Sequence, residues 1–422
     1  MKKSVVFLMV AILAFILVFS FSGCEKQPEN SSSVSIIKSE TSSLSSNNFS
    51  KSKEESSVVT SERISISATN SKVEASQSLT SSQENSSSQE QTSSSEEVLI
   101  DSSTYTREGD YILFGSYPQT KVSSTSTISA LNSLAGTLPT SSNSYNWTSY
   151  GYYISGSVTN FMWYIDKEYN DEKYRGVYFT QYRPYFTTGS IVGSAPDYYS
   201  YDYVSSESYK VYQTSTAYWF KYEPLKWRIL TTETASGQTN AMLLCESIID
   251  SQQYDYDGSY SNNYANSTIR SWLNNTFYET AFNSLQQEII NVTTVDNSIR
   301  STNPYQNVSE FNSGTNNYAC SNTQDKLFLL SQYEVTNTNY DFSTYSTYDS
   351  LRQKKNTDYA KVQGCWTSMS SGYEGNGGWW LRSPSCNSCN YAWSVFYYGG
   401  TNYEDIVKRA SRGVVPALWI RL

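Results

Sequence analysis

Histidine, the side chain most often used for acid–base catalysis and for binding transition metals, is absent from this chain of 422 residues. Its absence excludes Ser-His-Asp and Cys-His nucleophilic sites, and zinc or haem held by imidazole. The 39 acidic residues leave one alternative open, hydrolysis by a pair of carboxylates as in glycosidases, but the sequence does not show which two would converge. We therefore predict no catalytic residue and no set of metal ligands.

Five cysteines in the second half of the chain offer thiol chemistry. Cys386 and Cys389 have CxxC spacing, but neither a second such pair nor histidine completes a metal site, and no βαβ pattern surrounds them. Structural disulfides are the default outside the cytoplasm, so we predict disulfides among Cys320, Cys365, Cys386 and Cys389. Cys245 lies in an apolar run and is predicted to be a buried free thiol.

Aromatic and amide side chains near the C-terminal end form the candidate ligand site. Tyrosine and asparagine give large contacts at low entropic cost together with adaptable hydrogen bonds, as in antibody paratopes, and tyrosine faces also stack on sugars. These side chains surround a Gly-Gly pair in an expected surface region, and the alternative is that they only pack together. The candidate residues are Tyr391, Trp393, Tyr397, Tyr398, Asn402 and Tyr403.

No cofactor is predicted, and calcium is the one ion considered. Asp255-Tyr256-Asp257-Gly258 is similar to the start of a calcium loop, in which oxygen ligands at alternating positions suit a hard cation. No glutamate stands at the distance that an EF-hand requires, so a solvated turn is the favoured interpretation.

Arginine and tryptophan residues within apolar blocks are interpreted as structural rather than as ligand platforms. Arginines in such blocks would be buried and would donate to backbone carbonyls or carboxylates. The predicted structural set is Trp227, Arg228, Arg270, Trp272, Trp379, Trp380, Arg382, Pro416 and Trp419.

The first residues predict export from the cytoplasm. Lys2 and Lys3 precede an almost wholly apolar run over residues 5–21, and small residues follow it, which predicts a signal peptide over residues 1–23. The alternative is an uncleaved membrane anchor, for which about 17 residues is the short limit.

Cys24 directly follows Ser22-Gly23, and this arrangement resembles the lipobox of bacterial lipoproteins. The resemblance implies that Cys24 receives a diacylglyceryl group and becomes the new N-terminus, so that lipid anchors the chain to the membrane at the cell surface. Phe21 departs from the pattern, because a lipobox usually has Leu, Val or Ile there.

Residues 24–104 form a serine-rich, low-complexity segment that is predicted to be a disordered tether, because it cannot bury enough apolar surface to offset its chain entropy. The formal net charge of the chain is −9, which argues against nucleic acid as a partner.

Residues 105–422 are predicted to be one globular domain of the α+β class. We expect an irregular, mostly antiparallel sheet with one or two short helices, long loops and an irregular insertion near residues 121–215. Alternating or continuous apolar runs predict strands, and a capping residue before an amphipathic pattern predicts a helix. The expected strands lie at 109–115, 161–165, 176–179, 225–230, 241–245, 325–331, 379–384, 393–396 and 414–420, and the expected helices at 266–273, 285–290 and 357–364.

Seven blocks of this domain stand in a familiar order. They resemble a bacterial family of unknown function found in surface and secreted proteins, whose members are typed by WWLRSP and a terminal GVRPALW. Val415 replaces the arginine of that terminal motif, so the role of this arginine is lost or is transferred to Arg412. The blocks are GDYILFGSYPQT, PLKWRIL, STIRSWLNNTFYETAF, DKLFLLSQYEV, TDYAKVQG, WWLRSP and RGVVPALWI.

The order of elements and the closing motifs are also similar to the C-type-lectin-like fold, which formylglycine-generating enzymes share. A likeness of fold carries no activity by itself. From the tether, the acidic tyrosine-rich domain and this resemblance we expect a non-catalytic cell-surface module that binds glycan or protein. The alternatives are a structural envelope protein and a carboxylate-based polysaccharide hydrolase.

Overall fold

The computed structural model describes residues 104–140, 142–150, 162–179, 216–256, 261–299, 301, 319–344, 348–386 and 388–422, and the backbone alone of four short strands between 152 and 211. Contacts divide the chain into two compact units, 1–97 and 98–422, and the described residues belong to the second. The predicted signal peptide, Cys24 and the tether up to residue 103 lie outside the described residues. None of the helices in these ranges has the length and apolar character needed to cross a membrane.

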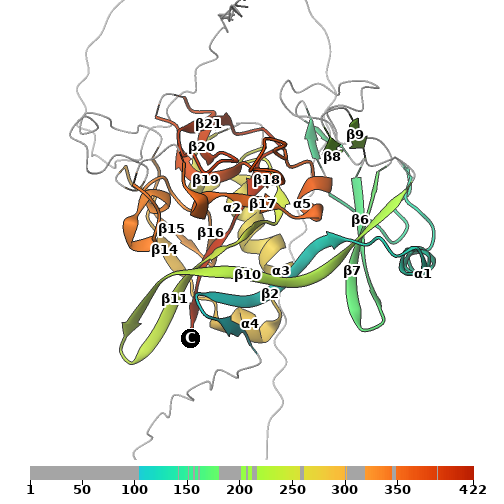
Figure 1. The fold of residues 1–422 in the computed structure, drawn as a ribbon, viewed down its shortest axis with the longest axis horizontal. Coiled ribbons are helices and arrows are strands. Elements are labelled where there is room, and N and C mark those ends of the chain that lie inside the picture. Colours follow the sequence, from blue (N-terminus) through green and yellow to red (C-terminus); the bar gives the residue numbers. More distant parts are fainter. Residues whose placement is uncertain are drawn as a thin grey trace, which may run out of the picture. The chain divides into compact units, whose positions relative to one another are not determined.

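The longest strand, β10 (Ala217–Ala235), organises a nine-stranded sheet in the described part of the chain. Its first residues pair with β7, its middle with β2 and its last residues with β11, as Figure 1 shows. The expected strands at 225–230 and 241–245 form a hairpin with a longer pairing than expected, because its turn has only two residues, Ser236 and Gly237, both with positive φ angles. The other strands of this sheet are β1 (Thr106–Glu108), β2 (Tyr111–Lys121), β3 (Thr148–Ser149), β6 (Met162–Tyr169), β7 (Glu172–Phe179), β11 (Gln238–Cys245), β16 (Leu327–Phe328) and β23 (Ala417–Arg421).

The predicted insertion joins this same sheet. Its strands β6 and β7 form a regular antiparallel hairpin that β10 extends. Helix α1 (Thr125–Ala135), which the sequence did not lead us to expect, packs Leu131 beside Trp219 in a second small core. The short strands β4 (Tyr152–Ile154), β5 (Ser157–Thr159), β8 (Tyr201–Ser205) and β9 (Ser208–Val211) form two separate hairpins.

A five-stranded sheet in the order β13-β22-β19-β20-β21 carries the WWLRSP segment. This segment coincides with β19, and all six of its residues are buried. The strands are β13 (Asp250–Ser251), β19 (Trp379–Pro384), β20 (Tyr391–Val395), β21 (Tyr403–Ile406) and β22 (Gly413–Val414). Smaller sheets contain β12 (Ser247–Ile248), β14 (Thr293–Val295), β15 (Thr323–Asp325), β17 (Lys354–Asn356) and β18 (Asn376–Gly377).

Helices are present at all three expected segments, which exceeds the one or two short helices expected for the domain, and side chains cap them. Ser267 accepts a hydrogen bond from the backbone N–H of Arg270, Asn283 forms a reciprocal capping box with Gln286, and Thr357 caps the third helix. The helices are α2 (Thr268–Trp272), which continues through a π-helical turn (Leu273–Phe277) into α3 (Tyr278–Ala281), then α4 (Ser284–Ile289) and α5 (Asp358–Val362). Single 3-10 turns occupy Tyr264–Asn266, Glu334–Thr336, Thr338–Tyr340 and Ser350–Arg352.

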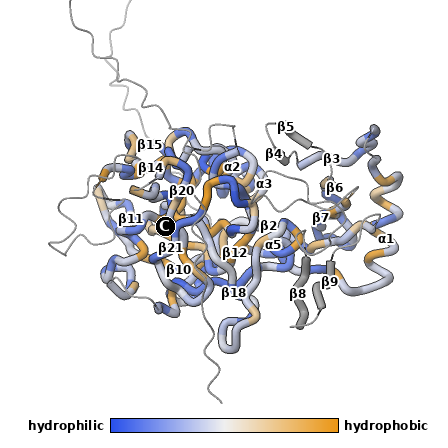
Figure 2. Tube along the Cα trace, turned by 90° about the horizontal axis from the view of Figure 1, so that it is seen from above, coloured by the Kyte–Doolittle hydropathy of each residue, from blue (hydrophilic) through white to orange (hydrophobic). Residues whose placement is uncertain are grey.

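The structure confirms a mixed helix-and-sheet domain whose strand pairs are mostly antiparallel. Among the described pairs, β12 with β17 and β19 with β22 are parallel. The apolar run at 325–331 is interrupted after β15, because Asn274 accepts the backbone N–H groups of Lys326 and Leu327. Figure 2 shows hydrophobic stretches inside the domain alternating with hydrophilic stretches in the outer loops.

The predicted disulfides among Cys320, Cys365 and Cys386 are wrong. Cys245, Cys320, Cys365 and Cys386 form no disulfide. The buried Cys365 thiol instead donates to the Asn356 side chain at 3.2 Å.

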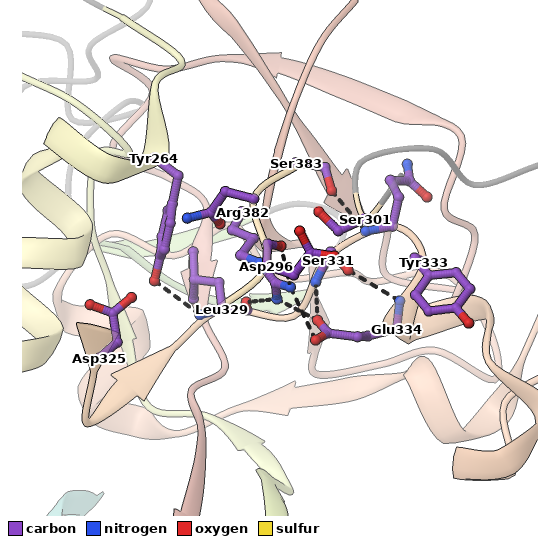
Figure 3. Close-up of polar contacts among 12 residues, drawn as sticks. Tyr264, Asp296, Ser301, Asp325, Leu329, Ser331, Tyr333, Glu334, Arg382 and Ser383 are labelled. Carbon is purple, nitrogen blue, oxygen red and sulfur yellow. Dashed lines mark hydrogen bonds and ion pairs between the residues drawn. The ribbon is translucent and has the colours of Figure 1, made fainter. Parts of the chain in front are cut away.

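Arg382 of β19 is the most highly bonded buried cation of this sheet. Its side chain is 2% exposed, and its two terminal nitrogens bind the Glu334 carboxylate in a bidentate pair (Figure 3). The same nitrogens donate to the carbonyl oxygens of Leu329 at 2.8 Å and Asp296 at 3.0 Å. One guanidinium therefore joins β19 to two segments about fifty and ninety residues earlier.

Arg382→Met is expected to lower the free energy of unfolding by about 3–5 kcal/mol, because it removes the cation that pairs with Glu334 and the donor to two backbone carbonyls, and leaves Glu334 with only the Ser331 N–H. Urea denaturation of the purified protein measures the loss. The control is Lys221→Met, which breaks an ion pair with Glu172 whose side chains are 38% and 45% exposed, and which is expected to cost less than about 1 kcal/mol. Equal losses in the two variants would contradict the assignment.

Candidate functional site

A cavity of about 250 Å³ opens beside the junction of the two larger sheets. This is slightly smaller than the roughly 300–1,000 Å³ of sites for drug-sized molecules, so it suits one small ligand or one unit of a polymer. Its wall mixes aromatic rings with hydroxyl, amide, carboxylate and guanidinium groups. The lining residues are Tyr117, Ser149, Tyr150, Tyr164, Arg175, Asp250, Gln252, Gln253, Tyr256, Thr268, Trp272 and Thr276.

Asp250 lies at the floor of this pocket and is 1% exposed. It begins β13, where its backbone pairs with Val414. One carboxylate oxygen accepts the Tyr117 hydroxyl at 2.8 Å, and the other accepts the Ser251 N–H at 2.6 Å and the Gln252 amide at 3.2 Å. These donors hold the carboxylate in a fixed orientation.

The WWLRSP strand fixes the backbone of this floor. The Trp380 indole donates to the carbonyl of Gln252 at 2.9 Å. The Tyr254 hydroxyl donates to the carbonyl of Arg382 at 2.9 Å. The strand that Arg382 anchors therefore also determines where Asp250, Gln252 and Gln253 lie.

The opposite wall comes from the β6–β7 hairpin. Asp166 and Arg175 are directly opposite in the register, and the guanidinium donates two hydrogen bonds of 2.8 Å to the carboxylate. Tyr222 donates to the same carboxylate at 2.9 Å. The held guanidinium lies 4.5 Å from the centre of the Tyr164 ring, which contacts the Tyr150 ring at 4.8 Å. These contacts hold the wall rigid, and the Asp166 carboxylate neutralises the charge of the Arg175 guanidinium.

Packed rings connect the two sides of the pocket. Trp272 of α2 stacks on Phe277 with a centroid distance of 5.4 Å, and Phe277 meets the edge of Tyr117 at 5.0 Å. Tyr117 in turn contacts Tyr359 at 5.5 Å, and the Tyr359 hydroxyl lies 2.6 Å from the Tyr150 hydroxyl. The ring of Trp272 is half-buried, so one part packs on the core while another faces the cavity.

The electrostatics of the pocket suit a neutral ligand rich in hydroxyl groups. Burial, reinforced by the Asp250 carboxylate, holds the pKa of Tyr117 well above its ordinary value, and burial likewise raises the pKa of Tyr359. Both phenols therefore stay uncharged at neutral pH. Among the described lining residues Asp250 is the sole carboxylate. Carboxylate, amide and phenol groups hydrogen-bond hydroxyls, while the rings cover an apolar face.

The predicted ligand residues are only partly brought together. Tyr397, Tyr398 and Tyr403 share one cluster with Phe396, which stacks on Tyr403 at 4.2 Å, and the Tyr398 hydroxyl donates to that of Tyr403 at 2.6 Å. Trp366 also stacks on Phe396. The rings are half-buried and face one another, so mutual packing accounts for much of their surface.

The other three predicted ligand residues make none of the described ring contacts that define this cluster. Tyr391, which is 37% exposed, and half-buried Trp393 lie on β20, and Asn402 is exposed just before β21. The lining of the 250 Å³ pocket includes none of the six predicted residues.

Most of the predicted structural set lies in the core. Buried members are Trp227, Arg228, Trp379, Trp380, Arg382 and Pro416, while Arg270, Trp272 and Trp419 are half-buried. Arg270 pairs with buried Asp325 at 2.7 Å. Trp272 is the member that also lines the pocket. Arg412, which we considered as a replacement for the missing motif arginine, pairs with buried Asp405.

No cluster of His, Cys, Asp and Glu that could hold a metal ion occurs within the described ranges. Asp255 of the calcium-like segment accepts the backbone N–H groups of Ser261 at 2.9 Å and Thr268 at 3.3 Å, so it organises the loop before α2. Asp257 and Gly258 lie outside the described residues.

None of the pocket residues was predicted to bind the proposed ligand: Trp272 was assigned to the structural set, and Tyr256 lies in the calcium-like segment. One usable signal was the polar run Asp250-Ser251-Gln252-Gln253 directly after the apolar stretch at 241–249, where side chains emerge from the end of a buried strand. No comparable signal marked Tyr150, because tyrosine is common throughout the chain, with 38 residues.

Residues 238–422 match the model of DUF6273, a domain of unknown function. The match supports the predicted resemblance from β11 onward, whereas the blocks at 109–120 and 224–230 precede it. It includes the pocket residues from Asp250 to Thr276 but not those of the β6–β7 wall. Comparisons with curated proteins and with solved structures find no match.

The wall should carry an acid-sensitive contribution to stability. Burial opposes ionisation of Asp166, but the hydrogen bonds and charge of Arg175 outweigh it and lower the carboxyl pKa below its ordinary value. A lowered folded-state pKa stabilises the fold above about pH 4 and loses that contribution as the pH falls through the folded pKa. Asp166→Asn should therefore lower the melting temperature more at pH 7 than at pH 3. An equal shift at both pH values would contradict this coupling.

Proposed function

We propose that the protein is a cell-surface lipoprotein whose folded domain binds an uncharged glycan, without catalysis, in the pocket above Asp250. The observation that carries the proposal is the composition of that pocket. The buried Asp250 carboxylate orients the Tyr117 hydroxyl and the Gln252 amide. These groups, with Gln253 and the other tyrosine hydroxyls of the lining, can hydrogen-bond ring hydroxyls, while Trp272 offers a flat apolar surface to the C–H face of a sugar ring.

The site favours binding over hydrolysis. A polysaccharide hydrolase of the usual type places two carboxylates about 5–10 Å apart across the scissile bond. The described lining offers Asp250 alone, and Asp166 is engaged with Arg175 and Tyr222. A C-type-lectin-like fold belongs to this proposal as well, because short helices, irregular antiparallel strands and the closing Trp-Leu-Arg strand are compatible with it.

Attachment to the membrane is the second part of the proposal. The apolar N-terminal run, the small residues before Cys24 and the serine-rich segment support a lipid anchor followed by a long tether. Such a tether would hold the glycan-binding domain away from the membrane, within reach of surface polymers.

Trp272→Ala should weaken binding of the preferred glycan by at least about tenfold, because it removes the aromatic surface of the pocket. Isothermal titration calorimetry against the best ligand of a glycan panel measures the change, in calcium and in chelator. Trp393→Ala is the matched control, since Trp393 is also half-buried but lies on β20. A larger loss in the control would move the site to the predicted aromatic surface, and no binding of any glycan would contradict the proposal.

Cys24→Ser should shift the protein from the membrane to the soluble extracytoplasmic fraction and abolish incorporation of labelled fatty acid, because serine offers no thiol for thioether formation. Fractionation of expressing bacterial cells measures the distribution. Continued membrane association of the variant would instead support an uncleaved apolar anchor.

A further inference from the structure

The two halves of the pocket come from different parts of the chain. Asp250, Gln252 and Trp272 lie within the segment that matches the domain family, whereas Tyr150 and Tyr164 precede it. We infer that the Tyr150–Tyr164 wall decides which sugar the pocket prefers, while the floor at Asp250 anchors hydroxylated ligands in general. This inference rests on the proposed function.

The floor is built by the family-matched segment itself. Ser251 donates to the carbonyl of Ala410 at 2.7 Å, and Gln253 donates to that of Lys408 at 2.7 Å. The Trp380 bond to Gln252 completes a set of contacts that all lie between residues 238 and 422. The matched segment therefore fixes the backbone of the floor, and Tyr117 from outside it adds one hydrogen bond to the Asp250 carboxylate.

The wall is built by residues before position 238. Asp166 orients Arg175, which lies over Tyr164, and the register pairs Ser149 with Trp163 on the neighbouring strand. Two hydroxyl contacts, Tyr150 with Tyr359 and Tyr117 with Asp250, join this side to the floor. Because Tyr164 takes part in neither contact, a change at Tyr164 alters what faces the ligand without displacing the floor.

Tyr164 is the residue of this wall best placed to discriminate. It lines the cavity, and within the described part of the chain its hydroxyl has no hydrogen-bond partner. Its ring contacts both the Arg175 guanidinium, at 4.5 Å, and the Tyr150 ring, at 4.8 Å, and these contacts restrict its position. A fixed hydroxyl increases the affinity for a sugar that places a hydroxyl opposite it, and it does not increase the affinity for an epimer that lacks a hydroxyl there.

The test compares Tyr164→Phe with Asp250→Asn by calorimetry of the full protein. The probes are the methyl glycosides of glucose, galactose, mannose and N-acetylglucosamine. Tyr164→Phe removes one oxygen and should change the ratio of dissociation constants between the two best sugars by roughly 3- to 10-fold. Asp250→Asn should weaken all bound sugars by a similar factor of about ten or more. Tyr145→Phe, a matched change at a tyrosine that is 49% exposed and does not line the pocket, should leave every affinity unaltered.

The outcomes separate the inference from the function on which it rests. If the unmodified protein binds sugars but Tyr164→Phe weakens all of them equally, or changes none, the inference is overturned while glycan binding stands. If the unmodified protein binds no sugar, both are overturned. Should Asp250→Asn fail to fold, the ratio measured with Tyr164→Phe still decides the question.

Discussion

Burying a guanidinium costs several kcal/mol of hydration free energy, and Arg382 is buried because the Glu334 carboxylate and two backbone carbonyls replace the water. That exchange fixes β19 against loops from distant parts of the chain. The same strand then holds the pocket floor, through the Trp380 indole and through its carbonyl partner Tyr254. The position of Asp250 thus depends on the partners of an arginine that stands 132 residues later in the chain.

Local chemistry made much of this fold predictable. Capping residues such as Ser267 and Thr357 mark helix starts, and apolar runs such as 241–245 mark buried strands, because these signals depend on neighbours in the sequence. The interruption at Lys326 was not predictable, since it depends on Asn274 from another element. Helix α1 escaped notice because serine and threonine dominate its sequence and only Leu131 and Ala135 are buried.

The candidate site was harder to predict than the fold for a physical reason. Composition drew attention to tyrosines near residue 400, yet Phe396 and Tyr403 satisfy each other by stacking, and much of their surface is lost to packing. The pocket instead gathers side chains from β6 and β7 and from the segment after β11, across more than seventy positions. These side chains converge because distant strands pair along β10, and this long-range pairing cannot be predicted from local sequence patterns.

A crystal structure of the protein soaked with its preferred sugar tests the central claim most directly, because it locates the ligand without relying on variants. We expect the sugar with a hydroxyl within hydrogen-bond distance of the Tyr117 hydroxyl or the Gln252 amide, which Asp250 orients, and with a ring face against Trp272. A sugar seated on Tyr397, Tyr398 and Tyr403 instead, with the pocket above Asp250 filled only by water, would contradict the account.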